Sequence, residues 1–345
     1  MVPNPPDPSV ALLQEAAARA GGRAAERIAQ VQAFLGEDLA VVDRELASAV
    51  RSGPSPAVDS AAHLLAAGGK RIRPLTVLLA AACFSGPGAA ARHLAVVAEL
   101  VHLATLLHDD VVDDGQQRRG QPTPRRIWGN AVSVLAGDLL LTHALERTSA
   151  AAPGPVLLDL IATLRRLVDG EVVQLRGRTR LEVDEDVYFR IVRDKTASLF
   201  AWAARSGAAV AGASREAVDA LGAFGEHVGV AFQLVDDVLD YAGDPAATGK
   251  ALLGDLTEGK LTLPLIRAVA ATPSLLADVE AVRSGDDARA LHVAHAVRSS
   301  NACVGVMAAA REETARALAS LDVIPAGVPR NLLGDIAREL ASRAA

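Results

Sequence analysis

Apolar residues recur at helical spacing along nearly the whole chain. Within residues 10–50, for example, Ile28, Val31 and Leu35 follow one another every three or four positions, with charged residues between them. This spacing is typical of an amphipathic helix. No stretch shows the sustained polar and apolar alternation of a half-buried strand. The pattern therefore predicts an all-α protein, a single large helical bundle around a central apolar cavity, with the ligand site formed by side chains on facing helices.

The expected organisation is a disordered, proline-rich tail over residues 1–9 and one helical domain over residues 10–345. Glycine and proline pairs divide the domain into its helices. Helices are expected at residues 10–50, 58–67, 89–114, 131–151, 155–177, 184–212, 215–242, 261–272, 275–283, 286–298, 301–320 and 329–343, with one more starting at Pro74. Residues 115–124 and 243–260 are expected to be loops.

Two acidic motifs interrupt this apolar background. Residues 109–113 read Asp-Asp-Val-Val-Asp and residues 236–240 read Asp-Asp-Val-Leu-Asp. In each motif the first and last aspartates share a helix face, where like charges repel, and an unpaired buried carboxylate is costly. A solvated helix end would explain one copy, but two copies inside apolar helices indicate a shared charge partner. Oxygen-only ligands select hard divalent cations.

Basic residues gather near these motifs. Residues 68–74 read Gly-Gly-Lys-Arg-Ile-Arg-Pro, which suits either an anion site at a helix N-terminus or a solvated cap. Arg118 and Arg119 offer planar forks for phosphate oxygens, although such a pair alone is usually surface charge. Lys195 precedes an apolar run, so its ammonium either reaches the surface or contacts a phosphate at the mouth of an apolar cavity.

Three further polar positions complete the candidate site. Gln233 lies on an apolar face, where it is either a core hydrogen bonder or a ligand contact. Lys250 and Lys260 each follow a glycine in the loop after the second acidic motif, which we predict to be a mobile lid. Together these groups suit two polyanions bridged by metal above an apolar interior. That description fits a diphosphate ester with a hydrocarbon tail.

Composition excludes several other classes. The net charge of −6 and the aromatic content of 3% argue against a nucleic-acid partner. With only Cys83 and Cys303, neither a disulfide framework nor a zinc site is expected, which fits a reducing cytoplasm. The start of the chain has no signal-peptide pattern, and the longest uncharged run, 74–91, is broken by glycine and proline, so no membrane span is expected. Nucleophile relays, Walker A loops and Rossmann glycine loops are absent from the sequence.

The motifs also carry a family resemblance, over residues 60–265. They are 68–74, Glu99-Leu100-Val101-His102, 108–113, Arg118-Arg119-Gly120, Lys195-Thr196, 232–240, Gly249-Lys250, Asp255 and 259–264. In this combination the chain resembles the trans (E)-isoprenyl diphosphate synthase, or polyprenyl synthetase, family. The resemblance implies the isoprenoid synthase type I fold, a homodimer, and head-to-tail transfer of an allylic prenyl diphosphate to isopentenyl diphosphate with Mg²⁺, or Mn²⁺ in its place. Such a product is expected to associate with membranes although the enzyme does not span them.

The resemblance also implies roles for individual residues. Metal would be bound by Asp109, Asp110, Asp113 and Asp236, with Asp237 and Asp240 as further candidates. The allylic diphosphate would be held by Arg118, Lys195, Lys250 and Lys260. Isopentenyl diphosphate would be bound by Lys70, Arg73, His102 and Arg119. Thr196 and Gln233 would shield the carbocation, and the released diphosphate would take the proton.

Product length is expected to depend on the helix before the first acidic motif. Ala104 and Thr105 lie one turn before Asp109, and Leu100 and Val101 lie on the next turn. In this family bulky aromatic residues at the first two positions resemble a plug that ends elongation. The plug is missing here, so we predict a heptaprenyl to decaprenyl product, a precursor of quinone side chains, and a shorter product for Ala104→Phe. A floor set lower down, which would give a farnesyl or geranylgeranyl product, stays an alternative.

Three other functions compete with this prediction. A terpene cyclase of the same fold needs no second diphosphate site, and the set of Lys70, Arg73 and Arg119 argues against it. A non-catalytic synthase subunit would be expected to have degraded aspartate motifs, and both are complete. A di-iron carboxylate bundle needs two Glu-x-x-His motifs, and only Glu99 and His102 supply one.

Overall fold

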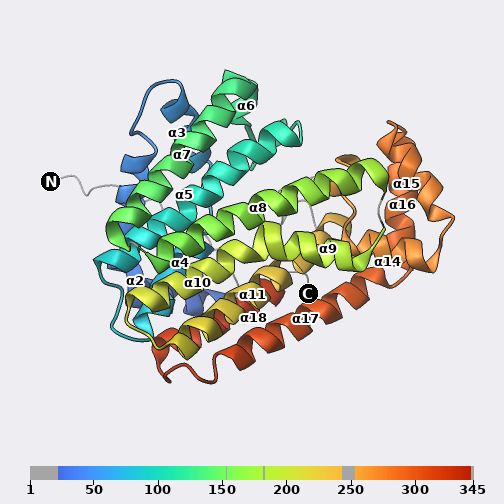
Figure 1. Cartoon of the computed structure of the whole chain (residues 1–345). Coiled ribbons are helices and arrows are strands. Elements are labelled where there is room, and N and C mark those ends of the chain that lie inside the picture. Colours follow the sequence, from blue (N-terminus) through green and yellow to red (C-terminus); the bar gives the residue numbers. More distant parts are fainter. Residues whose placement is uncertain (1–21, 153, 182, 243–252, 343–345) are drawn as a thin grey trace. The chain divides into compact units, whose positions relative to one another are not determined.

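The computed structural model describes residues 22–152, 154–181, 183–242 and 253–342. The tail predicted at residues 1–9 and Lys250 lie outside this part of the chain. Two compact units are interleaved along the sequence, with residues 1–160, 202–222 and 323–335 in the first and residues 161–201, 223–322 and 336–345 in the second. Helices form both units, which confirms the predicted all-α class (Figure 1).

The helices follow the predicted order with small shifts in their ends. The first unit contains α2 (Gly22–Ala49), α3 (Ala57–Ala66), α4 (Ile72–Ala82), α5 (Ala89–Val112), α6 (Pro124–Trp128) and α7 (Asn130–Ala151). The second contains α9 (Glu185–Ile191), η1 (Val192–Ala197), α13 (Gly254–Thr257), α14 (Leu263–Ala271), α15 (Leu275–Arg283), α16 (Asp287–Ser299) and α17 (Ala302–Ser320). Residues from both units occur in α8 (Pro155–Arg180), α10 (Ser198–Val210), α11 (Arg215–Ala242) and α18 (Val328–Ser342).

Several predicted segments differ from the structure. The expected loop at 243–260 contains the short helix α13, and the helix α6 was not predicted. The expected loop at 115–124 contains a two-stranded antiparallel hairpin, β1 (Gln117–Arg118) and β2 (Gln121–Pro122). Two-residue strands are too short to show an alternating pattern, so the sequence could not reveal them. The expected helix at 184–212 is divided by η1, a π-helical turn. Such turns are often found at functional sites.

Helix α5 is the core of the first unit, where it packs against α2, α4 and α7. Leu94, Leu100 and Leu107 have no exposed surface. At position 137 on α7 a Cβ atom would lie 2.2 Å from Nε2 of His108, so glycine leaves room on α7 for the imidazole ring of α5. The acidic motif at the end of α5 is therefore held by a tightly packed pair of helices.

Helix α5 is also long and apolar enough to cross a membrane by length and composition alone. However, 67% of its most apolar window is buried inside the protein. A core helix has this character as well, so its hydropathy is explained by packing. The predicted cytoplasmic location stays a prediction.

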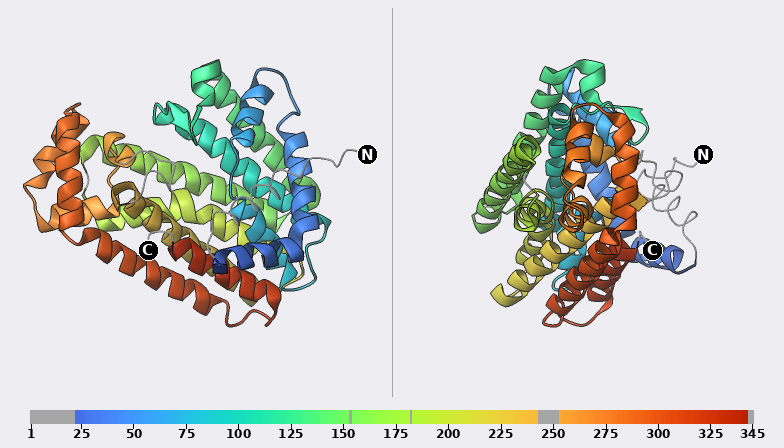
Figure 2. Two further views of the ribbon diagram at one scale, coloured as in Figure 1. Left: turned by 180° about the vertical axis from the view of Figure 1, so that it is seen from behind. Right: turned by 90° about the vertical axis from the view of Figure 1, so that its right-hand side faces the viewer.

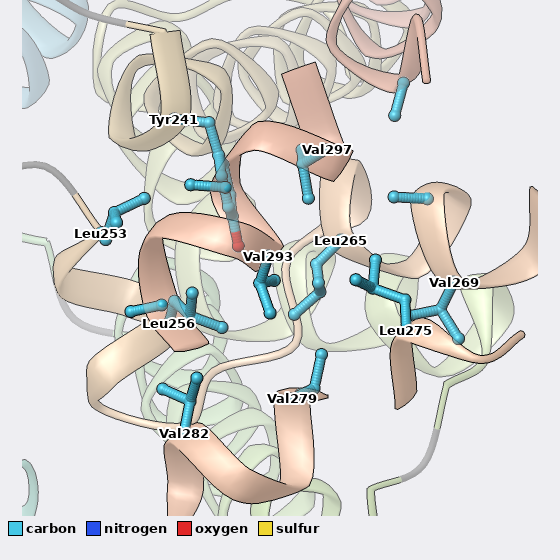
Figure 3. Packing of buried hydrophobic residues seen from close by; sticks show 14 residues of the cluster. Tyr241, Leu253, Leu256, Leu265, Val269, Leu275, Val279, Val282, Val293 and Val297 are labelled. Carbon is cyan, nitrogen blue, oxygen red and sulfur yellow. The ribbon is translucent and has the colours of Figure 1, made fainter. Parts of the chain in front are cut away.

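The second unit has its own apolar core at the C-terminal side of the second acidic motif. Leu256, Leu265, Val279 and Val293 are 0–1% exposed and point toward one another (Figure 3). Helices α15 and α16, which supply part of this core, lie side by side in both views of Figure 2. This packing supports the segment that carries Lys260.

Candidate active site

The hairpin of the first unit presents the two predicted arginines. Its register pairs Gln117 with Pro122 and Arg118 with Gln121, which leaves Arg119 and Gly120 as a two-residue turn. Both turn residues have positive φ, 51° and 76°, as a type I′ turn requires. An arginine in this left-handed region is uncommon, and strain of this kind concentrates at functional sites.

Arg118 binds the middle aspartate of the first acidic motif. Its Nε and Nη2 donate hydrogen bonds of 3.0 and 2.8 Å to Oδ1 of Asp110. Asp110 is 1% exposed, and among the described residues its Oδ2 accepts no hydrogen bond. Burial raises the pKa of Asp110, and the charge of Asp113 raises it too, while Arg118 acts in the opposite direction. Asp109 and Asp113, at the other two positions of the motif, are only partly buried.

A second basic group converges on the same arginine hairpin. Arg71 Nη1 donates a 2.5 Å hydrogen bond to Glu99 Oε1, and Arg71 Nε lies 3.8 Å from Oδ1 of Asp43. A Cβ at Gly69 would lie 3.0 Å from a guanidinium nitrogen of Arg71 and 3.2 Å from one of Arg119. The two basic segments that the sequence predicted separately therefore meet in space, around the buried carboxylate of Glu99.

This cluster makes His102 neutral. Burial lowers the pKa of His102 well below its usual value, and the nearby charges of Arg73 and Arg119 lower it further. Burial also lowers the pKa of Arg73 to about 10, against the raising effect of Glu99, so that guanidinium stays protonated at neutral pH. An uncharged imidazole has one N–H to donate to an anion. The cluster contains an excess of guanidinium groups and suits a polyanion.

The sequence prediction included Arg71 only as one cation of the basic run 68–74, without a substrate role of its own, and considered Glu99 only as part of a Glu-x-x-His motif. Arg71 has φ 49° at the N-cap of α4, a left-handed conformation that sequence spacing could not indicate. A glutamate on the buried face of the apolar helix α5 was the available signal, because such a group needs a charge partner.

The second acidic motif belongs to the second unit. Its middle aspartate, Asp237, is held by hydrogen bonds from two neighbouring side chains. Asp237 is 2% exposed, and its Oδ2 accepts a 2.6 Å hydrogen bond from the hydroxyl of Tyr188. Its Oδ1 accepts a 2.7 Å bond from Nε2 of Gln233. Burial raises the pKa of Asp237, and so does the charge of Asp255, whereas the two hydrogen bonds lower it. The predicted metal role of Asp237 stays a prediction, and the geometry favours a positioning role.

The last aspartate of this motif anchors the following segment. Asp240 Oδ1 and Oδ2 lie 3.0 and 3.3 Å from the backbone nitrogens of Gly254 and Asp255, which donate to them. Lys260 in turn pairs with Asp255, at 3.5 Å, and with Glu258, at 2.5 Å. The structure therefore links the motif to Lys260 through α13. Asp236, the first residue of the motif, is only partly buried.

Lys195 and Thr196 lie on the π-helical turn η1, which packs closely against Gly170 of α8 and Gly229 of α11. A Cβ at Gly170 would lie 2.8 Å from the backbone nitrogen of Lys195. Lys195 forms an ion pair with Glu171, and the oxygen of Gln174, with its amide suitably oriented, lies 3.2 Å from Nζ. Thr196 Oγ1 donates a 3.0 Å hydrogen bond to Oε1 of Gln233. Glu171 and Gln174 are one turn apart on α8, a signal that the sequence prediction left unused.

The four predicted chain-length positions differ in exposure. Ala104, Leu100 and Val101 are fully buried in the packing of α5. Thr105 is partly exposed, like Asp109 one turn later, and its hydroxyl donates to the carbonyl of His102 at 2.8 Å. Of the four, Thr105 alone is accessible on the face of α5 that carries the first aspartate of the motif.

The described residues contain no cluster of three or more His, Cys, Asp or Glu side chains already arranged to hold a metal ion. They do contain a cluster of arginine side chains around Glu99 in the first unit and, in the second, a hydrogen-bonded group around Gln233. The model of the polyprenyl synthetase family matches residues 56–299 of the chain. The chain belongs to that family.

Known members are similar over most of their length. The chain is 36% identical over 317 residues to heptaprenyl diphosphate synthase component 2 of Geobacillus stearothermophilus, covering 92% of this chain and 99% of the relative. It is 37% identical over 266 residues to the octaprenyl diphosphate synthase of Escherichia coli (strain K12), covering 76% and 82%. A Caulobacter crescentus polyprenyl synthase, crystallised with calcium and isoprenyl diphosphate, superposes with a TM-score of 0.87 at 36% identity, covering 92% and 98%.

These relationships confirm the predicted family, fold and enzyme class. The protein is a prenyltransferase of the long-chain trans type. The roles of individual residues, the metal, and the assembly state stay predictions.

Proposed function

We propose that this prenyltransferase condenses isopentenyl diphosphate with an allylic diphosphate to give a heptaprenyl to decaprenyl product, with Mg²⁺ as its metal. The observation that carries the proposal is the basic cluster of the first unit, where Arg71, Arg73 and Arg119 surround Glu99 on α5, the helix that ends in the first acidic motif. The neutral imidazole of His102 lies near the same arginines. A terpene cyclase does not need a diphosphate site of this kind in addition to its aspartates.

The candidate ligands fit a hard divalent cation. All of them are carboxylate oxygens, and Oδ2 of Asp110 is buried without a hydrogen-bond donor among the described residues. Mg²⁺ is usually held by one or two carboxylates together with substrate phosphates and water, so a preformed three-ligand cluster is not required. Asp109, Asp110 and Asp113 in the first unit and Asp236 in the second are the proposed metal ligands. Metal bound to them would supply positive charge to the leaving diphosphate.

The protein's own cations would divide between the two diphosphates. Arg118, Lys195 and Lys260 would hold the allylic diphosphate, and Lys70, Arg73, His102 and Arg119 would hold isopentenyl diphosphate. Lys195 and Lys260 are ion-paired with Glu171, Asp255 and Glu258, which keeps their ammonium groups in place before a phosphate arrives. The allylic carbon–oxygen bond then breaks and releases diphosphate, while Thr196 and Gln233 shield the cation. The double bond of isopentenyl diphosphate attacks this cation, and the released diphosphate takes the proton that the new cation loses to form the product double bond.

The test is turnover by the purified full chain with farnesyl diphosphate, isotopically labelled isopentenyl diphosphate and Mg²⁺, followed by sizing of the products. We expect labelled heptaprenyl to decaprenyl chains and no turnover with a chelator. Products formed without isopentenyl diphosphate, or turnover that persists in chelator, would contradict the proposal. Products no longer than geranylgeranyl would contradict the chain length alone.

We also propose that the protein forms a homodimer through α8. Ile161, Val168, Val172 and Leu175 are 48%, 62%, 59% and 37% exposed, and their spacing places them on one face of this helix. Exposed apolar stripes of this kind mark protein interfaces. The Geobacillus relative is named as one component of its synthase, so a different subunit is the alternative occupant.

A further inference from the structure

Tyr188 belongs to a chain of hydrogen bonds that ends at the residues assigned to the cation. The hydroxyl of Tyr188 donates a 2.6 Å hydrogen bond to Oδ2 of Asp237, and Nε2 of Gln233 donates a 2.7 Å bond to Oδ1 of the same residue. The hydroxyl of Thr196 donates a 3.0 Å bond to Oε1 of Gln233. All four residues belong to the second unit. Tyr188 is 6% exposed, so its hydroxyl depends on this partner.

The directions of these bonds fix the orientation of the Gln233 amide. Both oxygens of Asp237 accept hydrogen bonds, one from Tyr188 and one from the NH₂ group of Gln233. Asp237 therefore holds the NH₂ end of Gln233 and turns the amide oxygen away. An amide without such a partner would have two nearly equivalent orientations. The hydroxyl of Thr196, by donating to that oxygen, leaves its own lone pairs for another group.

The helix packing holds the same arrangement in place. A Cβ at Gly229 would lie 2.5 Å from Cα of Ala197, so α11 and η1 approach as closely as their backbones allow. On its other side, η1 lies against Gly170. The spacing between Thr196 and Gln233 is therefore set by backbone contact, and their hydrogen bond follows from it.

We propose that Tyr188 is a positioning residue for prenyl transfer. Acting through Asp237, it orients the carbonyl oxygen of Gln233 and the hydroxyl oxygen of Thr196 toward the allylic cation. Acceptor oxygens in fixed orientation stabilise a developing positive charge without reorganising during the reaction. The inference rests on the proposed function of Gln233 and Thr196, and it places Asp237 behind the site as a hydrogen-bond acceptor.

The test compares Tyr188→Phe with Tyr241→Phe in steady-state turnover. Tyr241 is the other tyrosine of the chain, and its buried oxygen accepts a 3.3 Å bond from Thr262 beside the leucine and valine core (Figure 3). We expect Tyr188→Phe to lower kcat by about tenfold, the factor for one lost buried hydrogen bond. The KM values and the Mg²⁺ concentration for half-maximal rate should stay unchanged, and Tyr241→Phe should keep the wild-type kcat.

A double-mutant cycle shows whether Tyr188 acts through Gln233. Gln233→Leu should lower kcat, and adding Tyr188→Phe to it should lower kcat no further. A wild-type kcat in Tyr188→Phe, an equal loss in Tyr241→Phe, or a tenfold loss that persists in the Gln233→Leu background would overturn the positioning role. If Gln233→Leu itself keeps the wild-type kcat, the proposed role of Gln233 fails first.

Asp237→Asn separates the relay from metal binding. Asparagine offers an NH₂ group that favours the reversed Gln233 amide, so kcat should fall at least as far as in Tyr188→Phe, with the same Mg²⁺ requirement as the wild type. A raised Mg²⁺ requirement would make Asp237 a metal ligand and overturn its positioning role.

Discussion

Arg118 places two donors, Nε and Nη2, on one oxygen of Asp110, at 3.0 and 2.8 Å. The contact joins the arginine hairpin to the last turn of α5. It therefore fixes the position of Arg118, the arginine predicted to bind diphosphate, relative to the acidic motif. It also distinguishes the three aspartates by exposure, since the middle one is buried under the arginine. An arginine fork is needed for this contact, because an ammonium is a single point charge.

Arg118→Lys should therefore raise the KM for the allylic diphosphate by about tenfold, with a smaller effect on the KM for isopentenyl diphosphate. The unfolding free energy should fall by about 1–3 kcal/mol, because the buried carboxylate loses a charged hydrogen-bond donor. Initial rates and denaturant unfolding measure the two effects. Arg126→Lys is the matched control, since Arg126 is exposed on the neighbouring helix α6 and should leave both quantities unchanged. An unchanged KM in Arg118→Lys would exclude this residue from the allylic site.

Product length should respond to Thr105 more cleanly than to Ala104. Thr105→Phe places an aromatic ring on the accessible face of α5, one turn before Asp109, and we expect a product of geranylgeranyl length or shorter. Ala104 is fully buried, so Ala104→Phe should lower stability by about 1–3 kcal/mol through overpacking. Product sizing and thermal unfolding check the pair. Wild-type product length in Thr105→Phe would show that chain length is set elsewhere.

The sequence was sufficient to predict what depends on repetition and spacing. The helical spacing of apolar residues predicted the all-α class. The acidic and basic motifs predicted the family, because several motifs that are weak one by one become specific when they occur in the same order. The apolar character of α5 and α11 followed from the same patterns. Helix ends at glycine, such as the break at 68–69, were placed within a few residues of the structure.

What the sequence could not predict depends on backbone conformation and on contacts between distant segments. The left-handed conformations of Arg71 and Arg119 are unusual for arginine, and no residue pattern specifies them. The π-helical turn at Lys195 occupies six residues, which is too few to change a hydrophobic period. Tyr188 lies 49 positions from Asp237, so only the fold brings them together. Lys250 lies outside the described residues, and its role stays a prediction.

Stability should fall in acid through a carboxylate remote from the candidate site. His227 Nδ1 and Glu313 Oε2 lie 2.6 Å apart and join α11 to α17, and Arg316 donates a 2.7 Å bond to the other oxygen. Burial raises the pKa of Glu313, but the bond and charge of His227 and the charge of Arg316 outweigh it, so the pKa lies below its usual 4.5. The stabilisation is therefore present above pH 4.5 and is lost as the pH falls through the folded-state pKa.

Glu313→Gln tests this relationship. At pH 7 the unfolding free energy should be lower than that of the wild type by about 1.5–3 kcal/mol, the range for a hydrogen bond to a charged group. The difference should narrow as the pH falls below 4.5, because the wild-type carboxylate then becomes protonated. Denaturant unfolding at several pH values measures it, with the exposed neighbour Glu312→Gln as control. A difference that stays constant with pH would assign the effect to packing.

The apolar stripe on α8 should hold two copies of the chain together. Val168 and Val172 are exposed and one turn apart, so Val168→Glu should leave the fold intact while placing a charge in the middle of the interface. An unpaired carboxylate buried by association is costly, and the dimer dissociation constant should rise about a hundredfold or more. Sedimentation equilibrium measures the constant, and Leu291→Glu, at a 70% exposed position of α16, is the control that should remain dimeric. A wild-type protein that sediments as a monomer would contradict the homodimer and favour a second, different subunit, as the name of the Geobacillus relative suggests for that enzyme.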